Sequence, residues 1–284
     1  MIIEKPSDIF LSSSGVCVND EENNWFPIKQ LRNLIITSSK GSISIPLLNE
    51  LSKNNIRVFL CDDKKEPSCE LMNAGIHSST AGNLMKQISW EKYRKKVAWK
   101  HIVENKIKNQ ARLLSYVGNE NANKLLEYAH SVEVNDETNR EGQAARIYFS
   151  ALFGPNFRRH SPDNINSALN YGYTILRTSI DRMITGHGYN TALGINHCSI
   201  ANRFNFSCDI MEPFRPFVDM LVFQNGDIKL SWDYKKLLIG TLQGRCIYDD
   251  REMSIEDAAE AYFLDIIGYL SGNEWKAGDI AFER

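Results

Sequence analysis

The sequence has no cysteine pair spaced for metal binding and no cysteine pattern typical of a disulfide framework. The six cysteines are Cys17, Cys61, Cys69, Cys198, Cys208 and Cys246. None of them forms a C-x-x-C pair, which argues against structural zinc. So few cysteines in 284 residues are typical of reduced thiols. We therefore expect a protein stabilised by its hydrophobic core rather than by cross-links.

The sequence also lacks long apolar runs and a strong excess of charge. No apolar run approaches the roughly 20 residues needed to cross a bilayer. The first residues, MIIEKPSDIF, lack the basic, apolar and small-residue regions of a signal peptide. We therefore expect a cytoplasmic protein with no membrane association. The net charge of −2 is too small and of the wrong sign for bulk attraction to nucleic acid, so any DNA site must be a local patch.

The distribution of sequence patterns predicts two domains of different class. The first 75 or so residues carry the strand signals IFLSSSGVCV, LIIT, GSISI and IRVFLC, with one short helix in PLLNELSKN. Later segments have the apolar spacing of helices, among them ANKLLEYAHSV, NREGQAARIYFSALFG and INSALNYGYTILRTSIDRMITG. We predict an α+β fold, with a β-rich domain over 1–75, a linker over 76–84 and a larger all-α domain over 85–284.

Near the C-terminus the sequence predicts one more helix. Ser254 and Asp257 have the spacing of a helix cap. The apolar stripe that follows consists of Ile255, Ala259, Tyr262, Ile266 and Leu270. We expect this stripe to face the core.

The segment from Met85 to Leu114 is rich in positive charge. It carries nine Lys or Arg against Glu91 and Glu104, with Trp90, Tyr93 and Trp99 interleaved. Lysines in such a strip bind phosphates, and aromatic rings cover sugars or bases. The lysines that we single out for DNA binding are Lys95, Lys96 and Lys100. The alternative is a solvated helix face above an ordinary core.

The stretch CDIMEPFRPFVDM places four charged side chains among apolar ones. On a single helix Asp209, Glu212, Arg215 and Asp219 are three or four residues apart and share one face. The two prolines lack N–H donors, which favours a helix that begins here. The simplest interpretation is a charge ladder in which Arg215 neutralises two acids.

Three residues along the chain have the chemistry of a metal site. Glu141 lies in REGQAARIYF, His197 in LGINHCS, and Glu212 fifteen residues after His197. Two carboxylates and one imidazole suit Mg²⁺ or Mn²⁺. Each residue also has a plain structural explanation, since a Glu at a helix start is often a dipole partner and a His near a turn is often merely hydrogen-bonded. The other histidines, His77, His101, His130, His160 and His187, have no carboxylates at metal spacing, and we expect structural roles for them.

The order of the motifs REGQAARIYFSALFG, ALNYGYTILR, GINHCS and FNFSCDIMEPFRPFVD resembles that of the CRISPR-associated spacer-acquisition integrase family. GSISIPLLNEL, IRVFLCDD and KIKNQARLL extend the resemblance over nearly the whole chain. The compact CDD and SW segments, together with Glu212, look most like the type II branch of this family.

The resemblance implies a sandwich-like N-terminal domain that serves dimerisation, followed by a helical catalytic domain. It also implies a homodimer, two copies of which are bridged by a small ferredoxin-fold partner into a hetero-hexamer on double-stranded DNA. The family's catalytic metal ligands fall on Glu141, His197 and Glu212, with Mg²⁺ or Mn²⁺ as the cofactor. Asp209, Arg215 and Asp219 are then expected to support these ligands or to hold a second metal.

The implied reaction inserts spacer DNA into a CRISPR array, when a 3′-hydroxyl of the spacer attacks a phosphodiester of the repeat. We expect Arg146, Asn170 and Tyr173 to contact the DNA or to support the site. Two alternatives remain, a non-catalytic DNA-binding scaffold and a metal-dependent DNA nuclease that acts alone.

Overall fold

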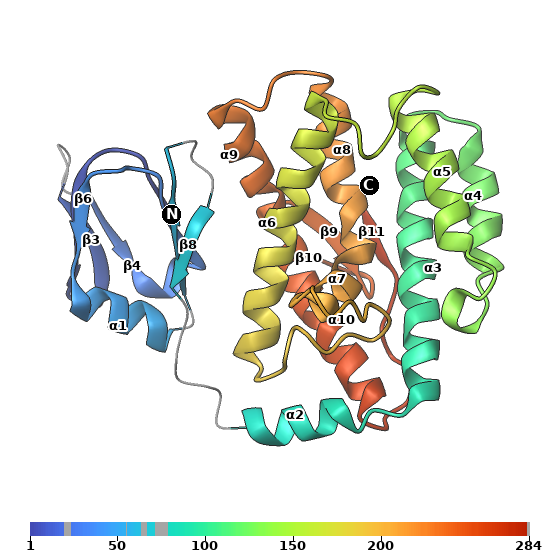
Figure 1. Ribbon diagram of the computed structural model, residues 1–284, viewed down its shortest axis with the longest axis horizontal. Helices are drawn as coiled ribbons and strands as arrows, with labels where there is room; N and C mark the ends of the chain where they lie inside the picture. Colours follow the sequence, from blue (N-terminus) through green and yellow to red (C-terminus); the bar gives the residue numbers. More distant parts are fainter. Residues whose placement is uncertain (20–23, 55, 64–66, 72–78, 283–284) are drawn as a thin grey trace. The chain divides into compact units, whose positions relative to one another are not determined.

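The computed structural model describes residues 1–19, 24–54, 56–63, 67–71 and 79–282. The chain divides into two compact units, Met1–Ser79 and Thr80–Arg284 (Figure 1). A β-rich N-terminal unit is followed by a larger helical one, which confirms the predicted fold class. Among the described residues, no helix is both long and apolar enough to cross a membrane.

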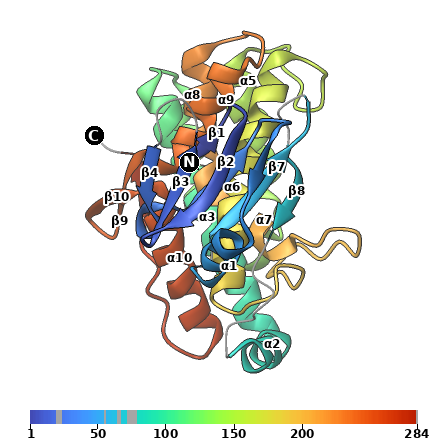
Figure 2. The same ribbon diagram turned by 90° about the vertical axis from the view of Figure 1, so that its left-hand side faces the viewer.

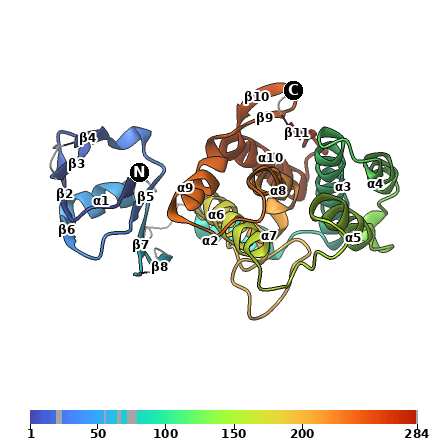
Figure 3. The same cartoon turned by 90° about the horizontal axis from the view of Figure 1, so that it is seen from above.

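The first unit contains two four-stranded sheets, one in the order β1-β5-β7-β8 and the other in the order β4-β3-β2-β6. The strands are β1 Ile2–Ile3, β2 Ser7–Ser12, β3 Gly15–Asn19, β4 Asn24–Pro27, β5 Asn33–Ile36, β6 Gly41–Ile43, β7 Arg57–Cys61 and β8 Pro67–Leu71. A short 3₁₀ turn, η1 (Ile28–Gln30), follows β4. Helix α1 (Ile45–Lys53) packs against β2 and β7. Figure 2 shows it near one end of the strands, and Figure 3 shows it between the two sheets. Leu47 and Leu51 of α1 are fully buried in the core that the sheets share.

The stretch IFLSSSGVCV, which carries strand signals, forms a hairpin. Strands β2 and β3 are antiparallel, with Ser12 opposite Gly15. The two turn residues, Ser13 and Ser14, have φ of 46° and 61°, as a type I′ turn requires. Gly15 lies under the Trp25 ring, where a Cβ would come within 2.2 Å of the indole, so this position requires glycine.

The second unit consists of helices and one small sheet. Its helices are α2 Thr80–Ile88, α3 Lys92–Tyr116, α4 Asn121–His130, η2 Val134–Asp136, α5 Arg140–Phe153, α6 Asn164–Gly186, α7 Asn205–Met211, η3 Glu212–Phe214, α8 Arg215–Asn225, α9 Trp232–Gly240, η4 Thr241–Gln243 and α10 Ile255–Leu270. Its strands, β9 Arg245–Tyr248, β10 Arg251–Ser254 and β11 Ile280–Phe282, form an antiparallel sheet in the order β10-β9-β11. The unit is therefore mostly helical but not all-α as predicted, because strands of three or four residues are too short to show a strand pattern.

Helix α3 packs against α4, α5, α10 and the Glu212 turn η3, and α6 packs against α7, α8 and α9 (Figure 1). The predicted apolar stripe of α10 is buried at all five positions. Ser254 caps this helix, since its Oγ accepts a hydrogen bond from the Asp257 N–H at 3.0 Å.

The predicted helical segment Met85–Leu114 is broken in the structure. Helix α2 ends at Ile88, and α3 begins at Lys92. Between them Trp90 is buried against Tyr189 and Phe206. The start of α2 at Thr80 also shortens the linker that we predict over 76–84, since Gly82 lies in the first turn of a helix rather than in a linker. The rest of that linker, 76–78, which includes His77, lies outside the described residues.

Candidate active site

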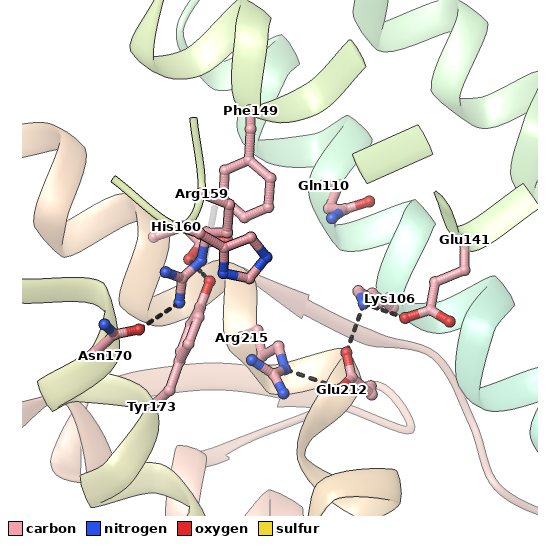
Figure 4. Close-up of a pocket in the computed structure, with 11 residues that line it drawn as sticks. Lys106, Gln110, Glu141, Phe149, Arg159, His160, Asn170, Tyr173, Glu212 and Arg215 are labelled. Atoms are coloured by element: carbon pink, nitrogen blue, oxygen red, sulfur yellow. Dashed lines mark hydrogen bonds and ion pairs between the residues drawn. The ribbon is translucent and has the colours of Figure 1, made fainter. Parts of the chain in front are cut away.

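Two carboxylates of the second unit converge on one ammonium group. Lys106 of α3 places Nζ 2.5 Å from Oε1 of Glu141 and 2.5 Å from Oε2 of Glu212 (Figure 4). Lys106 and Glu212 are buried, at 9% and 3% exposure. Burial alone would raise the pKa of Glu212, but Arg215 and Lys106 outweigh it and hold that pKa below its usual range. Likewise, burial alone would lower the pKa of Lys106, and the charges of Glu212 and Glu141 raise it. The group is therefore a charged cluster in which the ammonium of Lys106 lies between the carboxylates of Glu141 and Glu212.

The first turn of α5 fixes the position of Glu141. Asp136 accepts the backbone N–H groups of Arg140 at 2.7 Å and of Glu141 at 3.0 Å. Asn139, in the left-handed conformation, caps the helix by accepting the Gly142 N–H at 3.2 Å. A Cβ at Gly142 would come within 2.7 Å of the Asn139 side chain, so the glycine serves the cap. The sequence pattern of an acid beside a glycine thus reflects a tightly capped helix start.

Glu212 lies at a junction between two helices. It begins the short turn η3, and Pro216 occupies the first turn of α8, where a missing N–H is tolerated. Asn109 of α3 donates to the Pro213 carbonyl at 2.8 Å and ties the junction to α3. The expectation that Asp209, Glu212, Arg215 and Asp219 share one helix face is wrong, because η3 separates α7 from α8. Among these four described residues, the one direct ion pair is that of Arg215 with Glu212, with Nε 2.9 Å from Oε1.

Asp209 instead organises the loop that carries His197. Its buried carboxylate accepts the backbone N–H groups of Ile195, Asn196 and His197 at 2.5, 3.2 and 3.1 Å. It also bonds Nδ1 of His197 at 2.7 Å, and this hydrogen bond raises the pKa of His197 despite partial burial. A Cβ at Gly194 would lie 2.7 Å from the Asp209 carboxylate, so only glycine lets the loop close around it. With Nδ1 engaged by Asp209, Nε2 is the nitrogen of His197 that remains for a ligand.

The two carboxylates of the cluster are oxygen ligands of the kind that a divalent metal takes. Oε2 of Glu212 is buried, and Nζ of Lys106 lies 2.5 Å from it. Beside the hydrogen bond with Asp209, the charges of Glu212 and Glu141 also raise the pKa of His197, so the three side chains interact electrostatically. In the described part of the chain, no three acidic, histidine or cysteine side chains converge as metal ligands. Glu141 and Glu212 thus offer two carboxylates to one cation, and His197 does not join them as a third converging ligand in the described residues.

Asp219 lines the same cavity as this cluster and contacts tyrosines. It accepts hydrogen bonds from the hydroxyls of Tyr148, at 2.8 Å, and Tyr173. Burial raises the pKa of Asp219 to about 6. The guanidinium of Arg215 lies 4.6 Å from the centre of the Tyr173 ring. Asp219 is therefore held by two tyrosine hydroxyls rather than by the expected ion pair with Arg215. Tyr173 contacts both residues, Asp219 through its hydroxyl and Arg215 through its ring.

The sequence of this chain is similar to those of known proteins. A family model described as CRISPR associated protein Cas1 matches residues 1–231. The chain belongs to the Cas1 family. Among curated Cas1-family proteins, the CRISPR-associated endonuclease Cas1 of Neisseria meningitidis serogroup C (strain 8013) is 36% identical over 227 residues, which cover 78% of this chain and 75% of the relative. A Cas1 endonuclease of Francisella tularensis subsp. novicida is 25% identical, over 90% of each chain. Cas1-family membership confirms the expected activity of a CRISPR-associated endonuclease that inserts spacer DNA.

Solved structures share the Cas1 fold with this chain. A Cas1 protein from Thermotoga maritima superposes with a TM-score of 0.73 at 17% identity, covering 98% of this chain and all of the other. A casposase bound to its integration product has a TM-score of 0.74 at 18% identity, covering 98% of this chain and 92% of the other. At such identities the likeness shows the fold alone.

The residues predicted to bind DNA in this Cas1-family chain lie in different surroundings. Lys96 and Lys100 pair with Glu137 and Glu104 at 3.7 and 3.6 Å, so part of the predicted charge is compensated. Trp90 and Trp99 are buried in the core and cannot cover a base. Asn170 and Tyr173 line the cavity beside Glu212, whereas Arg146 is exposed on α5 and does not line it.

Five residues that line the cavity of this Cas1-family chain are not among the site residues predicted from the sequence, namely Lys106, Gln110, Phe149, Arg159 and His160. Lys106 is one of nine basic residues between 85 and 114, and nothing local distinguishes it, because its partners lie 35 and 106 residues away. Arg159 and His160 line the same cavity from the loop between α5 and α6. His160 was expected to have a structural role. Only the three-dimensional structure brings these residues to the site.

Proposed function

We propose that this Cas1-family endonuclease joins spacer DNA to the repeat by direct transesterification, at a metal ion held by Glu141, His197 and Glu212. The observation that supports this proposal is the convergence of Glu141 and Glu212 on a single cation, beside a histidine whose Nδ1 is engaged by Asp209. Two carboxylate oxygens and one imidazole nitrogen are ligands that Mn²⁺ accepts and that Mg²⁺ tolerates.

In this reaction the 3′-oxygen of the spacer forms a bond to the phosphorus at the edge of the repeat, and the bond from that phosphorus to the 3′-oxygen of the flanking nucleotide breaks. One phosphodiester replaces another, the proton of the attacking hydroxyl is transferred to the departing oxygen by way of solvent, and no protein nucleophile is needed. A bound metal ion would polarise the phosphoryl oxygens and stabilise the charge of the transition state.

The chain's own residues orient this site. Arg215 holds one oxygen of Glu212, which leaves Oε2 directed at the cation position. Asp209 fixes the ring of His197 and the backbone around it. Lys106 neutralises the two acids while no metal is bound, so the carboxylates stay together in the absence of the ion. Such positioning supplies much of the rate of phosphoryl transfer.

The partners of the protein are a further part of the proposal. Solved relatives include a Cas1–DNA complex with a TM-score of 0.58 and an assembly of Cas1 with Cas2. We infer that this chain also binds double-stranded DNA, forms a homodimer through its N-terminal unit and joins a small ferredoxin-fold partner of the Cas2 kind in a hetero-hexamer. The type II assignment rests on the CDD and SW segments and on Glu212.

The experiment is a strand-transfer assay with the protein and its partner subunit, a labelled spacer duplex and a plasmid that carries the repeat, with and without Mn²⁺. We expect metal-dependent products in which the spacer is joined to the plasmid. Binding without any products would support the scaffold alternative. Metal-dependent cleavage without joined products would support a nuclease that acts alone.

A further inference from the structure

The cavity beside Glu212 has two chemically different walls. Its volume is about 320 Å³. One wall is formed by Lys106, Glu141 and Glu212, in which one positive charge lies between two negative ones. The facing wall contains Arg159 and His160, as Figure 4 shows. The acidic wall belongs to the metal site, whereas the second wall has no role in it.

Arg159 is a cation held by neutral groups. Its Nη1 donates to Oδ1 of Asn166 at 2.9 Å and its Nη2 donates to Oδ1 of Asn170 at 2.8 Å. The guanidinium lies 5.2 Å from the centre of the Tyr173 ring. No carboxylate in the described residues forms an ion pair with it, in contrast to Lys106 and Arg215. Asp219, a nearby acid, directs both oxygens to tyrosine hydroxyls.

The partners of Arg159 are themselves fixed. Asn166 is 2% exposed, and its Nδ2 donates to the Arg158 carbonyl at 2.8 Å and to Asp163 at 2.9 Å. The guanidinium is therefore pre-organised before any ligand binds. It has five N–H donors, of which these hydrogen bonds use two, so three remain for an anion. A planar cation with unused donors is the group that proteins use to bind phosphate.

His160 adds a second donor on the same wall. Figure 4 shows its ring turned into the cavity beside Arg159, with Phe149 near it. Within the described ranges, no protein group is hydrogen-bonded to the imidazole of His160. An aromatic ring beside unused donors suits a nucleotide, since the ring contacts the base or sugar while the donors bind the phosphate.

We propose that Arg159 and His160 form a phosphate subsite, which binds the DNA phosphate adjacent to the reacting phosphodiester with its nucleotide against Phe149. This inference rests on the proposed function. DNA must approach two carboxylates that repel its phosphates, and the cations beside those carboxylates are already engaged. Arg159, which forms no ion pair in the described residues, supplies positive charge on the opposite side of the cavity. It thereby positions the strand across the metal site.

The test compares Arg159→Ala, Arg159→Gln and His160→Ala with the wild type in the full complex, with bound partner and saturating Mn²⁺. Single-turnover strand transfer, DNA affinity as a function of salt and calorimetric Mn²⁺ titration are measured. Arg159→Gln keeps donors for Asn166 and Asn170 but removes the charge, so it guards against simple misfolding. Arg158→Ala and His130→Ala are matched controls, since both residues are exposed and outside the cavity.

We expect both Arg159 variants to lose about tenfold or more in strand transfer, the range for a charge-assisted hydrogen bond. The slope of log affinity against log salt should fall by about one unit. Mn²⁺ affinity should remain unchanged, and His160→Ala should show a smaller loss of rate. Wild-type rates and salt slope in both Arg159 variants would overturn the subsite. If the wild type itself joins no DNA, the proposed function fails, and the salt slope still tests Arg159 as a phosphate contact.

Discussion

Nδ1 of His197 lies 2.7 Å from Oδ1 of Asp209, and the same carboxylate accepts the backbone N–H groups of residues 195 to 197. Asp209 therefore determines both the tautomer of His197 and the shape of the loop that carries it. This arrangement is the one by which proteins orient metal-binding histidines through a carboxylate.

Replacing Asp209 by Asn should weaken the metal site without abolishing it. The amide retains one acceptor but cannot accept from the whole set of N–H groups, so His197 loses its fixed orientation. We expect Mn²⁺ affinity to fall about 10- to 100-fold and strand transfer to fall in part. Calorimetry on Asp209→Asn measures the first effect. Asp233→Asn, an exposed change on α9, serves as the control, and equal Mn²⁺ affinity in both variants would contradict the role of Asp209.

Replacing Lys106 by Met should destabilise the metal-free protein. Removing one partner from a buried ion pair costs about 3–5 kcal/mol, because it leaves uncompensated charge. Here two carboxylates lose their cation, so Mn²⁺ should raise the melting temperature of Lys106→Met by more than it raises that of the wild type. Lys124→Met, on the exposed face of α4, is the control. Equal melting shifts in the variant and the wild type would show that the metal does not replace the ammonium.

Asp219 should make stability depend on pH. Its pKa is raised by burial from 3.8 to about 6, so between these values the native state binds more protons than the unfolded state. Its contribution to the free energy of unfolding is therefore largest below pH 4 and is lost as pH rises through 6. Between pH 5 and pH 8 the wild type should lose about 1.4 kcal/mol more than Asp219→Asn. Urea unfolding at both pH values measures this difference, and parallel losses would contradict it.

The lysines of α3 test the predicted cationic strip. If Lys95, Lys96 and Lys100 each contact a phosphate, their joint replacement by Ala should lower the slope of log affinity against log salt by about three units. The pairs with Glu137 and Glu104 are long and partly exposed, so DNA can compete for these lysines. An unchanged slope would identify this part of α3 as a solvated helix face.

The sequence predicted features that are encoded locally. The stripe from Ile255 to Leu270 has helical spacing and a cap, and it is buried as expected. The β-rich character of the first unit followed from strand signals, whereas its sandwich-like arrangement and the candidate ligands came from the family resemblance. The type II branch, the dimer and the individual ligands remain predictions.

Features that depend on distant partners could not be predicted. Lys108 and Arg112 both pair with Asp279, more than 160 residues away, so the positive charge of α3 was overestimated. The break before α3 arises because Trp90 enters the core, which no local pattern indicates. Asp209 and Glu212 are three residues apart but act on different segments, since the chain changes from α7 to η3 between them.

The most direct test of the metal site is a calorimetric Mn²⁺ titration of Glu212→Gln beside the wild type. The amide preserves the shape of the side chain and removes its charge, so the titration reports ligation rather than packing. We expect the wild type to bind Mn²⁺ and to join DNA, and Glu212→Gln to lose both while remaining folded. Mn²⁺ binding by Glu212→Gln at wild-type affinity would contradict the proposed site and leave Glu212 as a structural partner of Arg215 and Lys106.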